Sequence, residues 1–129
     1  MILLNILKRM ESMAEKIKEI IDEVIKIIED KKGIDLKVLD VSQISSFTDY
    51  MIICSGANEK QIQAIADEIF LKLKKKYNHL PGGIEGYKNA QWILMDYFDF
   101  VVNIFSLEAR ETYDLDSLWK DGKTILSEV

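Results

Sequence analysis

Helix-type and strand-type apolar spacings alternate along this chain, and the alternation restricts its possible folds more than any other feature. Residues 11–30 and 59–77 carry apolar side chains every three or four positions, which predicts two helices that each bury one stripe. Short apolar runs at 36–41, 50–54, 84–86, 92–96 and 100–105 predict strands, and short helical pieces follow from 107 to 119. This order predicts an α/β (α+β) domain, with helices packed on a single mixed sheet of about five strands.

The length of the chain suits one core. It has 129 residues, of which 48% are hydrophobic. We assign residues 13–120 to a single domain and 121–129 to a C-terminal tail. Residues 1–12 form an N-terminal extension, which is either a frayed helix or an artefact of the start site, since Met13 could serve as an alternative start. No apolar run is typical of a bilayer span or a cleaved signal peptide, so we expect a cytoplasmic protein without a membrane partner.

The charge of the chain narrows the choice of partners. A formal net charge of −5 argues against a large nucleic-acid footprint, because phosphate contacts need clustered Lys and Arg. An acidic domain can still bind a basic protein, whose opposite charge would speed the encounter. The single cysteine, Cys54, excludes a disulfide within the chain and a cysteine-rich zinc cluster. We interpret it as a small buried hydrophobic residue.

The strand at 92–96 contains the clearest candidate for a recognition surface. Trp92, Leu94 and Asp96 alternate with Ile93 and Met95, so the two sets lie on opposite faces. If helices cover the face of Ile93 and Met95, the other three side chains point outward. A large aromatic side chain beside a carboxylate favours protein recognition. The alternative is that Trp92 packs beneath the C-terminal helices.

Three patterns could indicate chemistry, and each has a simpler interpretation. The turn at 54–58 could hold a phosphate, but its single glycine lacks the spacing of a nucleotide-binding loop. Asp96 and Asp99 flank a two-residue turn, where Asp commonly bonds the backbone, whereas a metal pair would lie two residues apart on one face. His79, the only histidine, has no nucleophile beside it and is interpreted as a solvated loop residue. The sequence therefore predicts no catalytic residue, cofactor or metal.

Four spaced motifs resemble the ribosomal silencing factor family, also called Iojap-like. They are SSFTDYMIICSG at 45–56, IEG at 84–86, WILMDYFDFVVNIFS at 92–106 and YDLDSLW at 113–119. The resemblance implies a nucleotidyltransferase-like fold without the active site or its activity. It also implies binding to large-subunit ribosomal protein fourteen, with little direct contact with ribosomal RNA. By occupying that surface, such a protein would block joining of the small subunit and repress translation under nutrient limitation.

The resemblance also implies a partner-binding surface. Carried over to this chain, it comprises Trp92, Leu94, Asp96, Asp99, Arg110 and Tyr113. The chain departs from the family pattern at two positions. Phe98 stands where the family usually has glycine, so the turn either avoids a left-handed backbone or accepts strain. Asn103 stands where histidine is common, which argues against any role that needs an imidazole.

Two other functions remain open from the sequence. One is a divergent nucleotidyltransferase-like enzyme, which would use Ser55, Gly56, Asp96 and Asp99 with a divalent metal. The other is a self-associating scaffold, in which the face of Trp92 forms a homodimer in the free protein and is uncovered for the ribosome.

Overall fold

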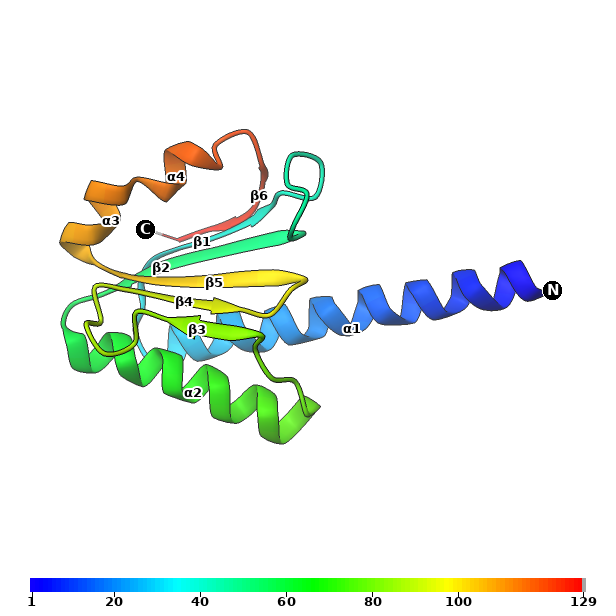
Figure 1. Cartoon of the computed structure of the whole chain (residues 1–129), viewed down its shortest axis with the longest axis horizontal. Coiled ribbons are helices and arrows are strands. Elements are labelled where there is room, and N and C mark those ends of the chain that lie inside the picture. The colour runs from blue at the N-terminus through cyan, green and yellow to red at the C-terminus, as the bar shows by residue number, and fades with distance from the viewer. Residues whose placement is uncertain (129) are drawn as a thin grey trace.

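One sheet separates two layers of helices in the computed structural model, which describes residues 1–128 (Figure 1). The helices are α1 (Ile2–Asp30), α2 (Glu59–Tyr77), α3 (Leu107–Tyr113) and α4 (Leu115–Leu118). The strands are β1 (Ile34–Asp40), β2 (Tyr50–Gly56), β3 (Gly83–Glu85), β4 (Trp92–Asp96), β5 (Phe100–Ser106) and β6 (Lys123–Ser127). Helices α1 and α2 lie on one face, and α3 and α4 on the other.

The sheet is mixed, as predicted. Its strand order is β3-β4-β5-β2-β1-β6. Strands β2 and β5 run parallel, and the other neighbouring pairs of described strands are antiparallel. The prediction of five strands missed β6, which pairs with β1 at the sheet edge. This short strand is mostly exposed and has no alternating apolar pattern that would have predicted it. Its hydrogen bonds to the neighbouring strand β1 hold it in place.

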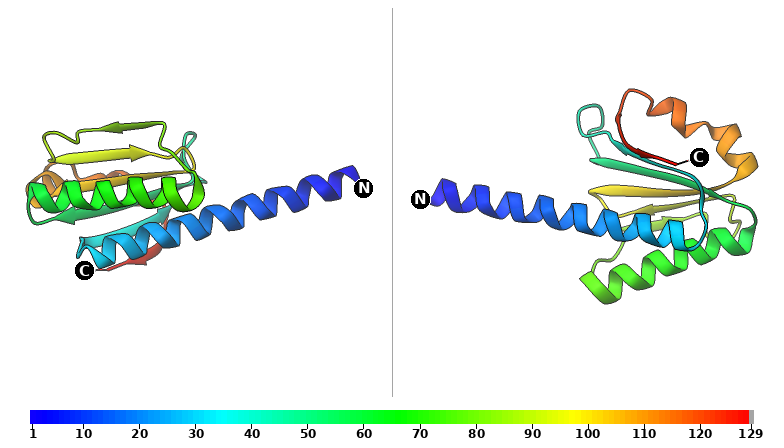
Figure 2. Two further views of the ribbon diagram at one scale, coloured as in Figure 1. Left: turned by 90° about the horizontal axis from the view of Figure 1, so that it is seen from below. Right: turned by 180° about the vertical axis from the view of Figure 1, so that it is seen from behind.

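Helix α1 is longer than the predicted 11–30 and begins at Ile2. Its buried side chains start at Ile20, while residues 1–16 are exposed. The first half of α1 therefore projects beyond the sheet, as both views of Figure 2 show. The helix ends before Gly33, as predicted. A Cβ atom at Gly33 would lie 2.5 Å from Cγ2 of Ile28, so only glycine fits there without a shift.

Two hydrophobic clusters occupy the two sides of the sheet. The larger joins α1 and α2 to the sheet through fully buried residues such as Ile28, Ile52 and Ile69. Cys54 belongs to this cluster, and burial raises the pKa of its thiol to about 12, which agrees with its predicted role as a buried hydrophobic residue. The smaller cluster lies under α3 and α4. None of the described helices has the length and apolar content needed to cross a membrane.

Candidate partner-binding site

Strand β4 divides its side chains between the two faces of the sheet, as its alternation predicts. Ile93 and Met95 are fully buried in the cluster below α1 and α2. Trp92, Leu94 and Asp96 are half-buried on the opposite face. Because α3 and α4 are short, they cover this face only in part (Figure 1). The three side chains therefore border a surface that a partner can reach.

The Trp92 ring is held between two aromatic side chains. It stacks on Phe105 of β5, with ring centroids 5.0 Å apart, and contacts Tyr113 of α3 at 4.9 Å. Its indole Nε1 donates a hydrogen bond to Oδ1 of Asn103 over 3.0 Å. The ring thus packs beside the C-terminal helices, as one sequence interpretation expected. It also stays partly exposed on the outward face, as the other expected. Tyr113 itself is 58% exposed.

Asn103 fixes the orientation of Trp92 from beneath. It lies opposite Leu94 in the pairing of β4 with β5 and is 1% exposed. Its Nδ2 donates to the carbonyl oxygen of Ile52 over 3.3 Å and approaches the Met51 sulfur at 3.0 Å, so its other end faces the indole. A buried amide with partners at both ends holds one orientation. Sequence reasoning missed this role, although the departure from histidine marked the position.

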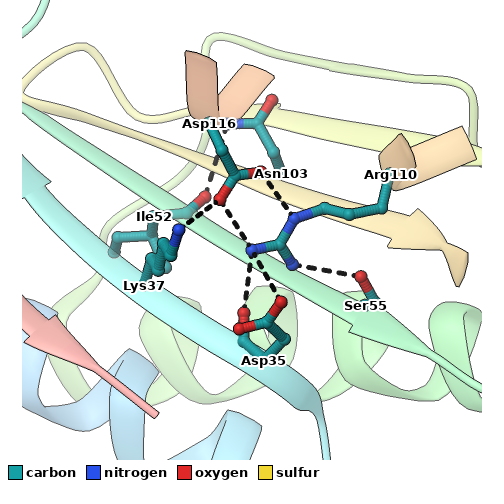
Figure 3. Close-up of polar contacts among 7 residues, drawn as sticks. All are labelled: Asp35, Lys37, Ile52, Ser55, Asn103, Arg110 and Asp116. Carbon is teal, nitrogen blue, oxygen red and sulfur yellow. Dashed lines mark hydrogen bonds and ion pairs between the residues drawn. The ribbon is translucent and has the colours of Figure 1, made fainter. Parts of the chain in front are cut away.

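Arg110 points into the domain, where it makes four hydrogen bonds and an ion pair with the Asp35 carboxylate (Figure 3). Its Nε and Nη2 donate to the two carboxylate oxygens of Asp116 over 2.8 and 3.0 Å. Nη1 donates to the Ser55 hydroxyl over 3.1 Å, and Nη2 to the Asp35 carbonyl over 2.9 Å. The arginine therefore ties α3 to α4 and to two strands, and its guanidinium is not part of the open surface.

The Arg110 guanidinium also controls the ionisation of Asp116. Its hydrogen bonds, with those of Lys37, lower the pKa of the Asp116 carboxyl to about 2, although partial burial opposes the shift. The Lys37 Nζ lies 3.0 Å from Oδ2 of Asp116. Two cations thus share one carboxylate, so α4 stays attached to the sheet across the neutral pH range.

The turn between β4 and β5 has a strained backbone at Phe98. Its φ is 70°, in the left-handed region that favours glycine. The Phe98 amide donates to Oδ1 of Asp96 over 2.9 Å, which stabilises this conformation. The Phe98 ring lies against Gly82, where a Cβ atom would come within 2.4 Å of it. Of the two outcomes expected from the sequence, strain is the one observed.

Asp99 lies beyond this turn, with its side chain exposed. Its carbonyl oxygen accepts hydrogen bonds from the amides of Asp49 and Tyr50, each over 3.1 Å. The Asp96 side chain therefore bonds the backbone, as the sequence predicts for a residue that flanks a turn, whereas Asp99 contributes its main-chain carbonyl. In the part of the chain that the structure describes, no three His, Cys, Asp or Glu side chains gather as metal ligands.

In the turn at 54–58, which could have held a phosphate, side chains of the protein accept the hydrogen bonds of the backbone amides. The Ala57 amide donates to Oε1 of Gln61 over 2.6 Å, and the Gln61 amide donates to Oδ1 of Asn58 over 2.9 Å. Asn58 thus caps α2, one of the two caps that the sequence predicts. These amides already have acceptors, so the turn is built as a helix cap.

The interpretation of His79 as a solvated loop residue is wrong. Its ring is half-buried and stacks on Tyr97 and Phe100, with centroids 5.4 and 6.2 Å apart. Its Nε2 is buried without a hydrogen-bond partner, as is the Tyr97 hydroxyl. The Lys- and Pro-rich neighbourhood of His79 suggested exposure, but the chain folds back against the aromatic end of the sheet after α2.

Comparison with known proteins shows which family this chain resembles. A family model described as "Ribosomal silencing factor during starvation" matches residues 14–129. The chain belongs to the ribosomal silencing factor family. A protein named ribosomal silencing factor RsfS, from Halalkalibacterium halodurans, is 36% identical over 107 residues, which cover 83% of this chain and 91% of the relative. The resemblance in the four sequence motifs is therefore confirmed.

Two further matches extend the comparison. A crystal structure of a protein from Chromobacterium violaceum matches with a TM-score of 0.76 and 33% identity, covering 87% of this chain and 92% of that one. A mouse protein named "Mitochondrial assembly of ribosomal large subunit protein 1" is 30% identical over 105 residues, which cover 77% of this chain and 44% of the mouse protein. The predicted fold class of this chain is thus confirmed.

Four of the six expected partner-binding residues come together on one face of this chain. Trp92, Leu94, Asp96 and Tyr113 border the open part of the sheet, Asp99 lies beyond the turn, and Arg110 faces inward. The same face continues to residues that sequence reasoning did not assign. Phe47 packs edge-on against Trp119 at 5.9 Å, and Phe47 and Leu118 are 65% and 69% exposed. The YDLDSLW motif contains two of these residues and could have indicated the extension.

Proposed function

We propose that this silencing factor binds large-subunit ribosomal protein fourteen through the open face of β4 and α3. The observation that carries the proposal is the fixed orientation of Trp92 beside the exposed ring of Tyr113. A large aromatic group that is already ordered loses little conformational entropy on binding. Such side chains commonly dominate the free energy of protein association.

The six expected residues divide into three roles in this proposal. Trp92, Leu94 and Tyr113 form the apolar centre of the interface, and Asp96 and Asp99 form its acidic rim. Arg110 is a positioning residue, because its contacts with Asp116 hold α3 and α4 beside the sheet. An acidic rim, on a chain of net charge −5, suits a basic ribosomal protein and limits direct contact with ribosomal RNA.

The proposed mechanism is steric exclusion and needs no catalytic residue. A bound domain would occupy the surface at which the small subunit meets the large one, and so would lower translation when nutrients are limiting. The names of the relatives support a role at the ribosome, since they refer to ribosomal silencing and to assembly of the large subunit.

Sedimentation of separated ribosomal subunits tests this function. Added protein should migrate with the large subunit and reduce the peak of joined ribosomes in proportion to its occupancy. Heat-denatured protein serves as the control for nonspecific effects. Unchanged joining, with the protein absent from the large-subunit peak, would reject the proposal.

A further inference from the structure

The projecting half of α1 carries an apolar stripe without a partner in the monomer. The stripe consists of Leu3, Ile6, Met10, Met13 and Ile17. Its steps alternate between four and three residues, and the same alternation continues through the buried Ile20, Val24 and Ile27. Seven-residue periodicity of this kind is typical of a helix that packs along a second helix. Residues 20–27 find that packing within the domain, whereas residues 3–13 have none there.

The stripe is large enough to matter. Seven apolar side chains of the projecting half are 45–78% exposed, namely Ile2, Leu3, Leu4, Ile6, Leu7, Met10 and Met13. Contiguous apolar surface of this size is uncommon on a protein that remains alone in water. Two such stripes packed together would bury roughly 1,000 Å² in total, which reaches the lower limit for a specific interface.

A groove lies where α1 leaves the domain. Its volume is about 510 Å³, and its walls include Met13 and Ile17 from α1, Tyr77 at the end of α2, and His79 just after that helix. The groove continues the stripe toward the sheet.

We propose that two copies of this chain pair through the projecting halves of α1, with the helices antiparallel. Leu3 of each copy packs against Met13 of the other, and Ile6 against Met10. The first turn of each helix then enters the groove of the other copy. The interface is the same patch on both copies, as two-fold symmetry requires.

The direction of pairing follows from the fold. Beyond Ile20 the stripe is already covered by the sheet and α2 of its own chain. A parallel partner would bring its own domain into that occupied space, whereas an antiparallel partner keeps the two domains at opposite ends. The seam also lies away from Trp92, so the dimer leaves the proposed ribosome-binding face open. The matched family region begins at residue 14, so the stripe up to Met13 is an addition to the shared domain.

Light scattering of the full chain over a range of concentrations tests the pairing. The wild type should rise toward twice the mass of one chain. Met10→Lys should stay monomeric, and the matched control Ser12→Lys, at an exposed position outside the stripe, should behave as the wild type. A monomeric wild type at every concentration overturns the proposal, and so does a dimer that Trp92→Ala dissociates and Met10→Lys does not.

Cysteine cross-linking tests the direction. Leu3→Cys/Met13→Cys should form an intermolecular disulfide on mild oxidation, because position 3 of each copy faces position 13 of the other. Leu3→Cys alone should not, because the two copies of position 3 lie at opposite ends of the antiparallel seam and the native Cys54 is buried. Cross-linking of Leu3→Cys alone would overturn the antiparallel arrangement. A wild type that stays monomeric but binds vesicles of anionic lipid, and loses that binding in Met10→Lys, would assign the stripe to a membrane surface instead.

Discussion

The two faces of the sheet are built for different purposes. On the face under α1 and α2, two long helices cover the strands and leave fully buried aliphatic side chains. On the face under α3 and α4, two short helices cover only part of the sheet, and a polar network around Arg110 holds them. The first face stabilises the fold, while the second keeps an ordered aromatic surface within reach of a partner. This difference teaches where substitutions should affect stability and where they should affect binding.

Neighbouring residues on β4 provide the largest expected contrast. Ile93→Ala removes a fully buried side chain and should lower the free energy of unfolding by about 2–5 kcal/mol. Leu94→Ala, on the half-covered face, should lower it by less than about 1.5 kcal/mol. Denaturant unfolding of both variants measures the contrast. Equal losses would show that the two faces contribute alike to stability.

Substitution of Trp92 should weaken binding, whereas substitution of Ile93 should lower stability. Trp92→Ala should weaken binding to ribosomal protein fourteen by about 2 kcal/mol or more, because it removes the ordered centre of the proposed interface. Trp92→Phe keeps an aromatic ring on Phe105 but loses the hydrogen bond to Asn103, so its free energy of binding should be weaker by about 1 kcal/mol. Calorimetry on folded samples checks both values. Wild-type affinity in Trp92→Ala would remove this residue from the interface.

Acid should loosen the half-covered face through Asp116. Its pKa in the folded state is about 2, below the ordinary 3.8, so its contribution to stability is present above about pH 4 and is lost as the pH falls toward 2. Solvent screening limits that contribution to about 1 kcal/mol. Unfolding of wild type and Asp116→Asn at a series of pH values isolates it. The two curves should converge at low pH, and a constant separation would contradict the assignment.

Salt provides the smallest expected effect. The on-rate for ribosomal protein fourteen should fall a few-fold as the ionic strength rises, because rim charges guide the encounter. Asp99→Asn should weaken this salt dependence, whereas Asp22→Asn, which removes an exposed charge on α1, should leave it nearly unchanged. Stopped-flow kinetics measures both rates. An on-rate indifferent to salt would exclude charge steering.

Local spacing was enough to predict the helices, five of the strands and the two faces of β4, because these depend on side chains a few positions apart. Contacts between distant segments could not be predicted in the same way. Asn103 reaches Trp92 through the register of β4 with β5, and Arg110 binds the carbonyl of Asp35, which lies 75 positions away. Strand β6 escaped prediction because its pairing with β1, and not an apolar pattern, holds it. His79 was misplaced because its stacking on Tyr97 depends on the path of the chain after α2.

Two exposed tyrosines allow the most direct test of the central claim, which is that the half-covered face binds the ribosomal partner. Tyr113 beside Trp92 is 58% exposed, and Tyr87, which bonds to Asp67 of α2, is 41% exposed. The affinity of each Tyr→Ala variant for isolated large-subunit ribosomal protein fourteen should be measured by titration. The account predicts that Tyr113→Ala binds at least tenfold more weakly than wild type and that Tyr87→Ala binds as wild type does. Loss of binding in Tyr87→Ala, with wild-type affinity in Tyr113→Ala, would contradict it.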